Sequence, residues 1–215
     1  VMIPPVAHFI WFGTAFPWVH LLALRSAAAE GGFERIVLHH ADDLRGSPWW
    51  TEAQLIGRLE ARPLDPEQIL ARVPTYGPDL VTIYRRLEKP AARANMVRAA
   101  LLHREGGVYL DLDTVTTASL VPLMEKGGVF CGREHVVFPA TVKRSRNPLV
   151  WLRAAGQTTL RDIMRRSPNG WSAFRRIAGR YPTAVNNAII GAEPGHPFMT
   201  RLLAEMTRLP EAEQL

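Results

Sequence analysis

Residues Val97–Asp113, with the sequence VRAALLHREGGVYLDLD, place a helix, a stop signal and a strand in direct succession. The run from Pro90 onward is rich in alanine and leucine and lacks glycine, which predicts a helix with proline in its first turn. Gly106-Gly107 then supplies the positive-φ residue that favours a helix C-terminus. After the glycines, apolar residues alternate with Tyr109, Asp111 and Asp113, which is the period of a strand. We therefore predict a strand over 108–113 whose two carboxylates point to the same side.

The chain before this segment has the pattern of a parallel α/β unit. The apolar run from Val6 to Gly13 predicts a buried strand, the segment 17–29 a helix, and Arg35 to His40 a second strand. A strand, a helix and a strand in this order predict a βαβ unit and a parallel sheet. Elsewhere we expect helices at 51–60, 148–166, 171–180 and 197–209, a short helix from Pro66, and strands at 128–131 and 135–142.

Length and composition indicate one globular domain. The chain has 215 residues, of which 47% are hydrophobic and 21% charged, as is usual for a soluble protein with a single core. A single cysteine, Cys131, excludes an intrachain disulfide and favours a reducing compartment, so the cytoplasm is the expected location. We find neither a long uninterrupted apolar segment nor the features of a signal peptide in residues 1–13.

The net charge of +6 is concentrated in one region. Between Lys143 and Arg180 there are ten lysines and arginines and a single acid, Asp162. The simplest interpretation is a solvated, arginine-rich helix surface, and attraction to anionic lipid headgroups or an acidic acceptor is the alternative. No nucleic-acid-binding motif accompanies the charge, so we expect no nucleic-acid partner. Residues 139–181 are our candidate for an acceptor-side or membrane-facing helical region.

Asp111-Leu112-Asp113 is a D-x-D motif at the predicted carboxyl end of a buried strand. Open α/β sheets bind ligands at that edge, and two carboxylates there can hold Mg²⁺ or Mn²⁺ together with a substrate diphosphate. This is the chemistry of a nucleotide-sugar transferase. The same residues also fit a haloacid-dehalogenase-type phosphatase with Asp111 as the nucleophile and Asp113 as the acid/base. That alternative requires a downstream acidic pair, whereas Asp162 is the only later aspartate.

Four blocks of the chain, at 8–13, 94–98, 106–113 and 187–198, resemble the DXD sugar-binding glycosyltransferases. That family includes yeast α-1,6-mannosyltransferases and vertebrate α-1,4-galactosyltransferases, and more distantly the clostridial glucosylating toxins. The resemblance implies a GT-A-like α/β domain over 1–215, with a mixed, mostly parallel sheet and helices on both faces. It also implies a metal-dependent, retaining transfer from a nucleotide sugar to an acceptor hydroxyl. A UDP-sugar is the favoured donor and GDP-mannose the alternative, and the acceptor is a glycan, a glycolipid or a protein.

The resemblance also assigns roles to individual residues. Trp11 matches an aromatic residue that stacks on the donor base, with Phe9 beside it, although a core tryptophan is an equal alternative. Arg98 matches an arginine that reaches the donor sugar or phosphate. Asn95 and Asn187 match donor-side positions. Asp111 matches the first acid of the motif, which is expected near the donor ribose and sugar, and Asp113 matches the metal ligand. We assign both acids to the metal and, with Arg98, to the expected catalytic residues.

Two departures from the family pattern leave a non-enzymatic alternative open. The family usually has an aspartate where this chain has Asn95, and an amide keeps the hydrogen-bonding carbonyl but loses the charge. Family members also continue beyond the position of Leu215 into a segment that closes over the donor. A degenerate fold that binds a glycan or nucleotide without turnover therefore remains an alternative.

Overall fold

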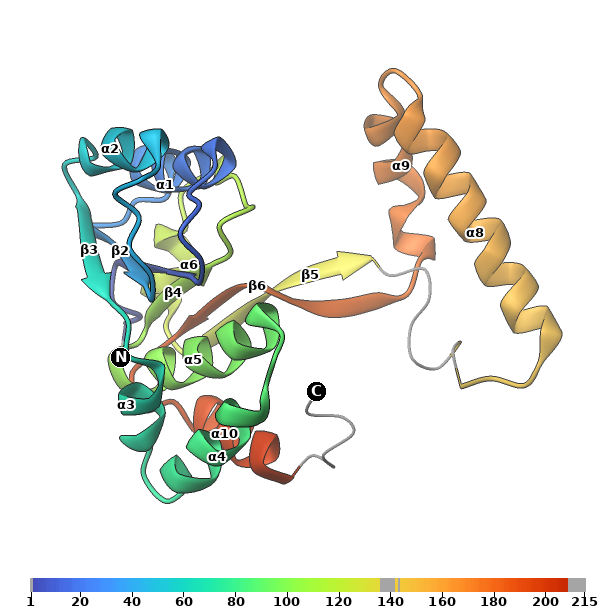
Figure 1. Cartoon of the computed structure of the whole chain (residues 1–215). Helices are drawn as coiled ribbons and strands as arrows, with labels where there is room; N and C mark the ends of the chain where they lie inside the picture. The colour runs from blue at the N-terminus through green and yellow to red at the C-terminus, as the bar shows by residue number, and fades with distance from the viewer. Residues whose placement is uncertain (1, 136–141, 143, 209–215) are drawn as a thin grey trace. The chain divides into compact units, whose positions relative to one another are not determined.

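The computed structural model describes residues 2–135, 142 and 144–208, which group into two compact units. Unit 1 comprises Val1–Phe130 with Ala188–Leu215, and unit 2 comprises Cys131–Asn187. The sequence predicted one domain with a distinctive region at 139–181, and this domain organisation stays a prediction. We describe each unit by itself (Figure 1).

Unit 1 is built on the predicted parallel unit. Strand β1 (Val6–Trp11), helix α1 (Trp18–Glu30) and strand β2 (Arg35–His40) follow in sequence, and β1 pairs in parallel with β2 over its whole length. Strands β3 (Leu59–Pro63) and β4 (Gly107–Leu110) extend the parallel sheet on either side. Strand β6 (Thr183–Ala192) pairs antiparallel with β4, and β5 (Val129–His135) follows it in the order β3-β2-β1-β4-β6-β5. The predicted α/β class with a mixed, mostly parallel sheet is confirmed.

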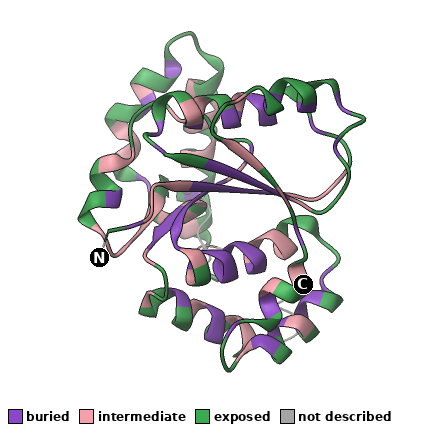
Figure 2. Cartoon of the chain, turned by 90° about the vertical axis from the view of Figure 1, so that its left-hand side faces the viewer, coloured by how far each residue is buried: buried purple, intermediate pink, exposed green. Residues whose placement is uncertain are grey.

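Helices cover both faces of the sheet in unit 1, as the fold class requires. Helices α1, α2 (Pro48–Gln54) and α6 (Val121–Lys126) lie on one face, and α5 (Pro90–Glu105) lies on the other (Figure 1). Beyond α5 pack α3 (Pro66–Ala71), α4 (Gly77–Arg86) and α10 (Pro197–Arg208). On these helices, the buried residues lie on the sides that face the sheet or a neighbouring helix, and the exposed residues lie on the outer sides (Figure 2).

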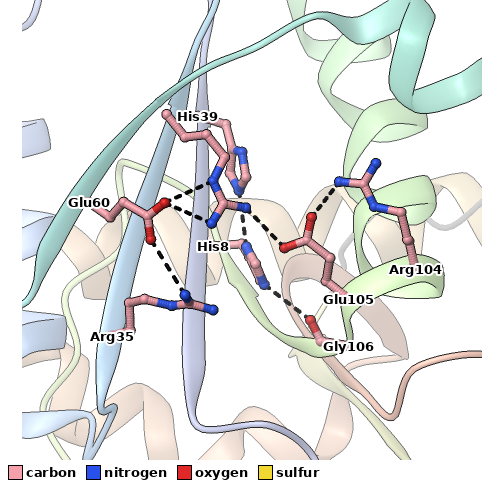
Figure 3. Close-up of polar contacts among 8 residues, drawn as sticks. His8, Arg35, His39, Glu60, Arg104, Glu105 and Gly106 are labelled. Carbon is pink, nitrogen blue, oxygen red and sulfur yellow. Dashed lines mark hydrogen bonds and ion pairs between the residues drawn. The ribbon is translucent and has the colours of Figure 1, made fainter.

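A buried histidine pair fixes the corner between α5 and β4. The His8 Nε2 atom lies 3.1 Å from the Gly106 carbonyl oxygen, and His8 Nδ1 lies 3.0 Å from His39 Nε2 (Figure 3). Because a carbonyl only accepts, His8 donates through Nε2–H, and its Nδ1 accepts from the Nε2–H of His39. A Cβ on Gly107, where φ is +97°, would lie 2.7 Å from the Val6 carbonyl oxygen. The close approach at Gly107 therefore requires glycine and sets where β4 begins.

The structure corrects three sequence predictions. The helix predicted over 51–60 ends at Gln54, and Leu59–Pro63 forms β3 instead, because pairing with β2 outweighs local helix preference. The strand predicted over 108–113 ends at Leu110, because the backbone N–H and hydroxyl of Thr114 both donate to the Asp111 carbonyl and turn the chain. Strand β6 was not predicted. The strand predicted over 135–142 lies almost wholly outside the described residues, and β5 extends from 129 to 135.

Unit 2 contains a pair of helices with a small core of its own. Helix α8 (Pro148–Arg166) begins at Asn147, whose side chain accepts from the backbone N–H of Leu149. Helix α9 (Gly170–Ile177) continues into a 3₁₀ turn, η1 (Ala178–Arg180), and packs against α8. Both predicted helices are confirmed. Within the described part of the chain, no helix combines the length and apolarity needed to cross a membrane.

Candidate functional site

A cavity of about 310 Å³ opens in unit 1 at the carboxyl ends of β1 and β4. This is the edge at which an open α/β sheet binds ligands. Three segments supply its walls: the end of β1, one face of α5, and the turn after β4. The lining residues are Ile10, Trp11, Phe12, His20, Pro90, Ala91, Ala94, Arg98, Tyr109, Asp111, Leu112 and Asp113. The structure thus brings together Trp11, Arg98 and both acids of the D-x-D motif.

Arg98, Tyr109 and Asp111 form one interacting cluster in the cavity wall. Arg98 is only 5% exposed, its Nη1 lies 3.4 Å from Asp111 Oδ1, and its guanidinium carbon lies 4.6 Å from the centre of the Tyr109 ring. The Tyr109 hydroxyl donates to the same Oδ1 at 2.7 Å. Burial, together with the neighbouring Asp111 carboxylate, raises the pKa of Tyr109, so its hydroxyl stays protonated. The cluster therefore fixes the Asp111 carboxylate through one oxygen, and Oδ2 takes part in neither bond.

The sequence alternation placed Tyr109 on the same side of the strand as the two acids, but it assigned Tyr109 no function in the site. The alternation of residues 108–111 was the available signal, because Tyr109 and Asp111 are two positions apart in an extended segment. The direct hydroxyl–carboxylate bond depends on the turn at Asp111, which the strand prediction did not include. Tyr109 is thus a positioning residue that sequence reasoning undervalued.

The D-x-D turn fits a metal ion that is shared with a ligand. Asp113 is exposed at the cavity wall and Asp111 is partly buried. Across the described residues, no group of three or more histidine, cysteine or acidic side chains could hold a metal by itself. Mg²⁺ characteristically binds one or two carboxylates and completes its shell with substrate phosphates and water. Two adjacent carboxylates at an open cavity match that donor set better than an all-protein cage.

His20, which sequence reasoning missed, joins the aromatic end of the cavity to the D-x-D turn. Its Nδ1–H donates to the Leu112 carbonyl oxygen at 3.0 Å, and its ring centre lies 4.2 Å from that of Trp11 in an edge-to-face arrangement. Burial lowers the pKa of His20, so the neutral ring carries its proton on Nδ1. The Nε2 atom is buried and has no hydrogen-bond partner within the described structure. A histidine within the apolar α1 sequence gives no local signal of this role.

Of the predicted donor-binding residues, Phe9, Asn95 and Asn187 do not line the cavity. Phe9 is fully buried in the hydrophobic core, so the assignment of Phe9 to donor binding is wrong. Asn95 is half-buried on α5 and is absent from the lining, where Ala94 and Arg98 of the same helix are found. Asn187 is an exposed residue of β6 within unit 2, and its donor-side role stays a prediction. Trp11 both packs against the core and lines the cavity, and its stacking on a donor base stays a prediction.

Comparison with known proteins agrees with this geometry. Residues 32–130 match the profile of the glycosyltransferase sugar-binding region containing the DXD motif.

The fold is similar to that of the PaToxG glycosyltransferase (TM-score 0.57, 15% identity, 96% of this chain and 61% of that one). It is also similar to the ligand-free glycosyltransferase domain of the YGT toxin (TM-score 0.51, 10% identity, 96% of this chain and 63% of that one). The chain thus spans about three fifths of either structure. No curated protein sequence gives a significant match. The matched region contains Arg98 and both acids of the motif, so this part of the chain is similar to the DXD-containing sugar-binding region of that glycosyltransferase family.

Proposed function

We propose that this chain transfers a sugar from a nucleotide-sugar donor to an acceptor hydroxyl, with retention of anomeric configuration. The observation that carries the proposal is the convergence of a buried guanidinium, Arg98, and two carboxylates, Asp111 and Asp113, in one cavity beside an indole, Trp11. These groups match the parts of a nucleotide sugar, which has an aromatic base, a diphosphate and a hydroxyl-rich sugar.

In the proposed complex, the donor base stacks on Trp11 and the diphosphate lies between Arg98 and the D-x-D turn. A guanidinium withdrawn from water interacts more strongly with developing phosphate charge than an exposed one does. Asp111 and Asp113 would hold Mn²⁺ or Mg²⁺, and a bound ion would neutralise charge on the leaving diphosphate. The Tyr109 hydroxyl and the His20 ring keep the two ends of this turn in place.

The cavity favours a front-side displacement. Among the residues lining the cavity, Asp111 and Asp113 are the only carboxylates, and both are assigned to the metal and diphosphate. In the displacement, the acceptor oxygen bonds to the anomeric carbon as the bond to the donor phosphate breaks, and the acceptor proton passes to the leaving phosphate oxygen. The Arg98 side chain stabilises that oxygen, so the step requires no protein nucleophile.

The resemblance to the family favours a UDP-sugar over GDP-mannose as the donor. A glycan, a glycolipid or a protein would supply the acceptor hydroxyl. The basic stretch Lys143–Arg180 is our candidate for the acceptor side or for peripheral membrane contact, because its positive charge suits acidic acceptors and anionic lipids.

Donor hydrolysis without an acceptor tests the proposal. We expect the protein to release UDP or GDP from one of a panel of nucleotide sugars in the presence of Mn²⁺. The Asp113→Ala variant should lose at least about 100-fold in rate, as is typical when one stabilising group of a transition state is removed. Asp79→Ala is the matched control, because Asp79 is exposed on α4 and does not line the cavity.

Two outcomes would contradict the proposal. Tight nucleotide binding without turnover over the whole panel would identify a binding module, which is the alternative motivated by Asn95. Hydrolysis of a generic phosphate ester that is abolished by Asp111→Asn would identify a phosphatase. The structure disfavours the phosphatase, since the described residues contain no further acidic group beside Asp111 and Asp113 for a metal.

A further inference from the structure

We propose that a second cavity, within unit 2, binds a phosphate-bearing ligand. The cavity has a volume of about 690 Å³, which lies within the usual range for small-molecule sites. Four arginines from three different elements line it: Arg133 from β5, Arg161 and Arg165 from α8, and Arg175 from α9. The proposal is independent of the sugar-donor site, which is formed by residues of unit 1 alone.

The charge around this cavity is not balanced within the described protein. Arg161 pairs with its neighbour Asp162 at 2.9 Å, and no ion pair is found for Arg133, Arg165 or Arg175 among the described residues. Among the described residues that line the cavity, Glu134 is the only acid, and its carboxylate also accepts a hydrogen bond from Asn186. Several guanidinium groups that face one cavity repel one another, and a bound anion would remove that repulsion.

The spacing of the arginines follows from the helix pairing. Arg161 and Arg165 are four residues apart and so lie on the same face of α8. Helix α9 packs against α8, and Arg175 from α9 reaches the same cavity. The sequence showed only that residues 143–180 are basic. The tertiary structure places three of those arginines in the wall of this cavity, together with Arg133, which lies outside the basic stretch.

The chemistry of the wall favours a phosphate ester over a simple inorganic anion. Guanidinium groups bind phosphate through pairs of parallel hydrogen bonds, and several of them suit a group that carries close to two negative charges. Beside them, the rings of Trp171 and Phe174 stack with their centres 5.7 Å apart, and Trp171 is 56% exposed. This apolar wall would contact the organic part of the ligand. The side chain of His135 also lines the cavity, and its Nδ1 is buried with no hydrogen-bond partner within the described structure.

A soluble phosphate ester and a phospholipid headgroup share this chemistry, and two assays separate them. The first is isothermal titration of the whole chain with inositol trisphosphate, in EDTA so that metal-dependent binding at the D-x-D turn does not contribute. The second is co-sedimentation with phosphatidylcholine vesicles that contain one tenth phosphatidic acid, compared with pure phosphatidylcholine vesicles.

The test variant is Arg165→Gln/Arg175→Gln, and the matched control is Arg166→Gln/Arg176→Gln. Both variants remove two exposed charges from the same helices, but Arg166 and Arg176 do not line the cavity. We expect the test variant to weaken binding at least tenfold and the control to change it less than about twofold. Binding of inositol trisphosphate would assign a soluble ligand, and binding only to phosphatidic acid vesicles would assign a lipid. Equal losses in both variants, or no binding in either assay, would overturn the proposal.

Discussion

Acidification should destabilise the chain through the buried pair His8 and His39. Both side chains are about 1% exposed and share one hydrogen bond. Burial lowers the pKa of His8 to about 4 and that of His39 to about 3. Glu105 raises the pKa of both histidines and Arg62 lowers it, and burial remains the largest influence on each pKa.

The sign of the effect follows from proton binding. An unfolded histidine titrates near pH 6.5, so below that pH the unfolded chain binds protons that the folded pair excludes. The stability contributed by the neutral pair is complete above about pH 6.5 and falls as the pH drops toward the folded pKa values. At pH 5 the folded pair is still neutral, so the loss depends mainly on the unfolded histidines. It is therefore insensitive to the exact folded pKa values.

Between pH 7 and pH 5 this reasoning gives a loss of about 2 kcal/mol for each histidine. The sum of about 4 kcal/mol is a large part of the 5–15 kcal/mol that typically separates folded from unfolded domains. Protonation of His8 on Nδ1 would also set two N–H groups against each other across the 3.0 Å contact with His39. To accommodate that proton, His39 would have to move its own proton from Nε2 to Nδ1 and accept through Nε2.

Urea unfolding of the wild type and of His8→Leu/His39→Leu at both pH values tests this magnitude. Replacing both partners by apolar side chains removes the titration without leaving a buried donor unpaired. We expect the wild type to lose about 4 kcal/mol more than the variant between pH 7 and pH 5. Other titrating groups are common to both proteins and cancel in the comparison. Equal losses in the two proteins would refute the assignment of the acid sensitivity to this pair.

Three further substitutions probe the site and its support. Tyr109→Phe removes the hydroxyl that donates to Asp111 Oδ1, so donor turnover should fall about tenfold or more while the temperature of thermal unfolding changes little. An unchanged kcat would show that the hydroxyl does not position the carboxylate. His20→Phe keeps the aromatic contact with Trp11 but loses the hydrogen bond to the Leu112 carbonyl, so Mn²⁺-dependent binding of a nucleotide sugar should weaken more than metal-free binding of the nucleoside. His20→Asn should instead weaken binding of the nucleoside more than Mn²⁺-dependent binding of the nucleotide sugar. Gly107→Ala places a Cβ 2.7 Å from the Val6 carbonyl oxygen at a positive φ, so chemical denaturation should show that the free energy of unfolding falls by about 2 kcal/mol or more. A smaller loss of stability would mean that β1 and β4 can move apart at this position at little cost.

Sequence periodicity predicted the parts of unit 1 whose structure is set locally. The Ala/Leu-rich segment from Pro90, ended by Gly106, is a helix of the predicted length, and the apolar runs of β1 and β2 form the predicted parallel pair. Local patterns failed where pairing partners are distant. β3 forms because it pairs with the edge of β2, and the strand predicted to include Asp111 ends at Leu110 because Thr114 donates back to the Asp111 carbonyl.

By itself, the sequence determined that the chain is an α/β protein with two acids, Asp111 and Asp113, at the end of a buried strand, because helix and strand periods and the D-x-D spacing are local properties. The resemblance to the family added Arg98 to the expected site. The tertiary structure alone decided how those residues interact. It buried Arg98 against Tyr109 and placed His20 between Trp11 and the turn. In the tertiary structure, Phe9 also lies in the hydrophobic core, and Arg133 lines the same cavity as the arginines of α8 and α9. These outcomes depend on contacts between segments far apart in the chain, and no spacing along the sequence encodes such contacts.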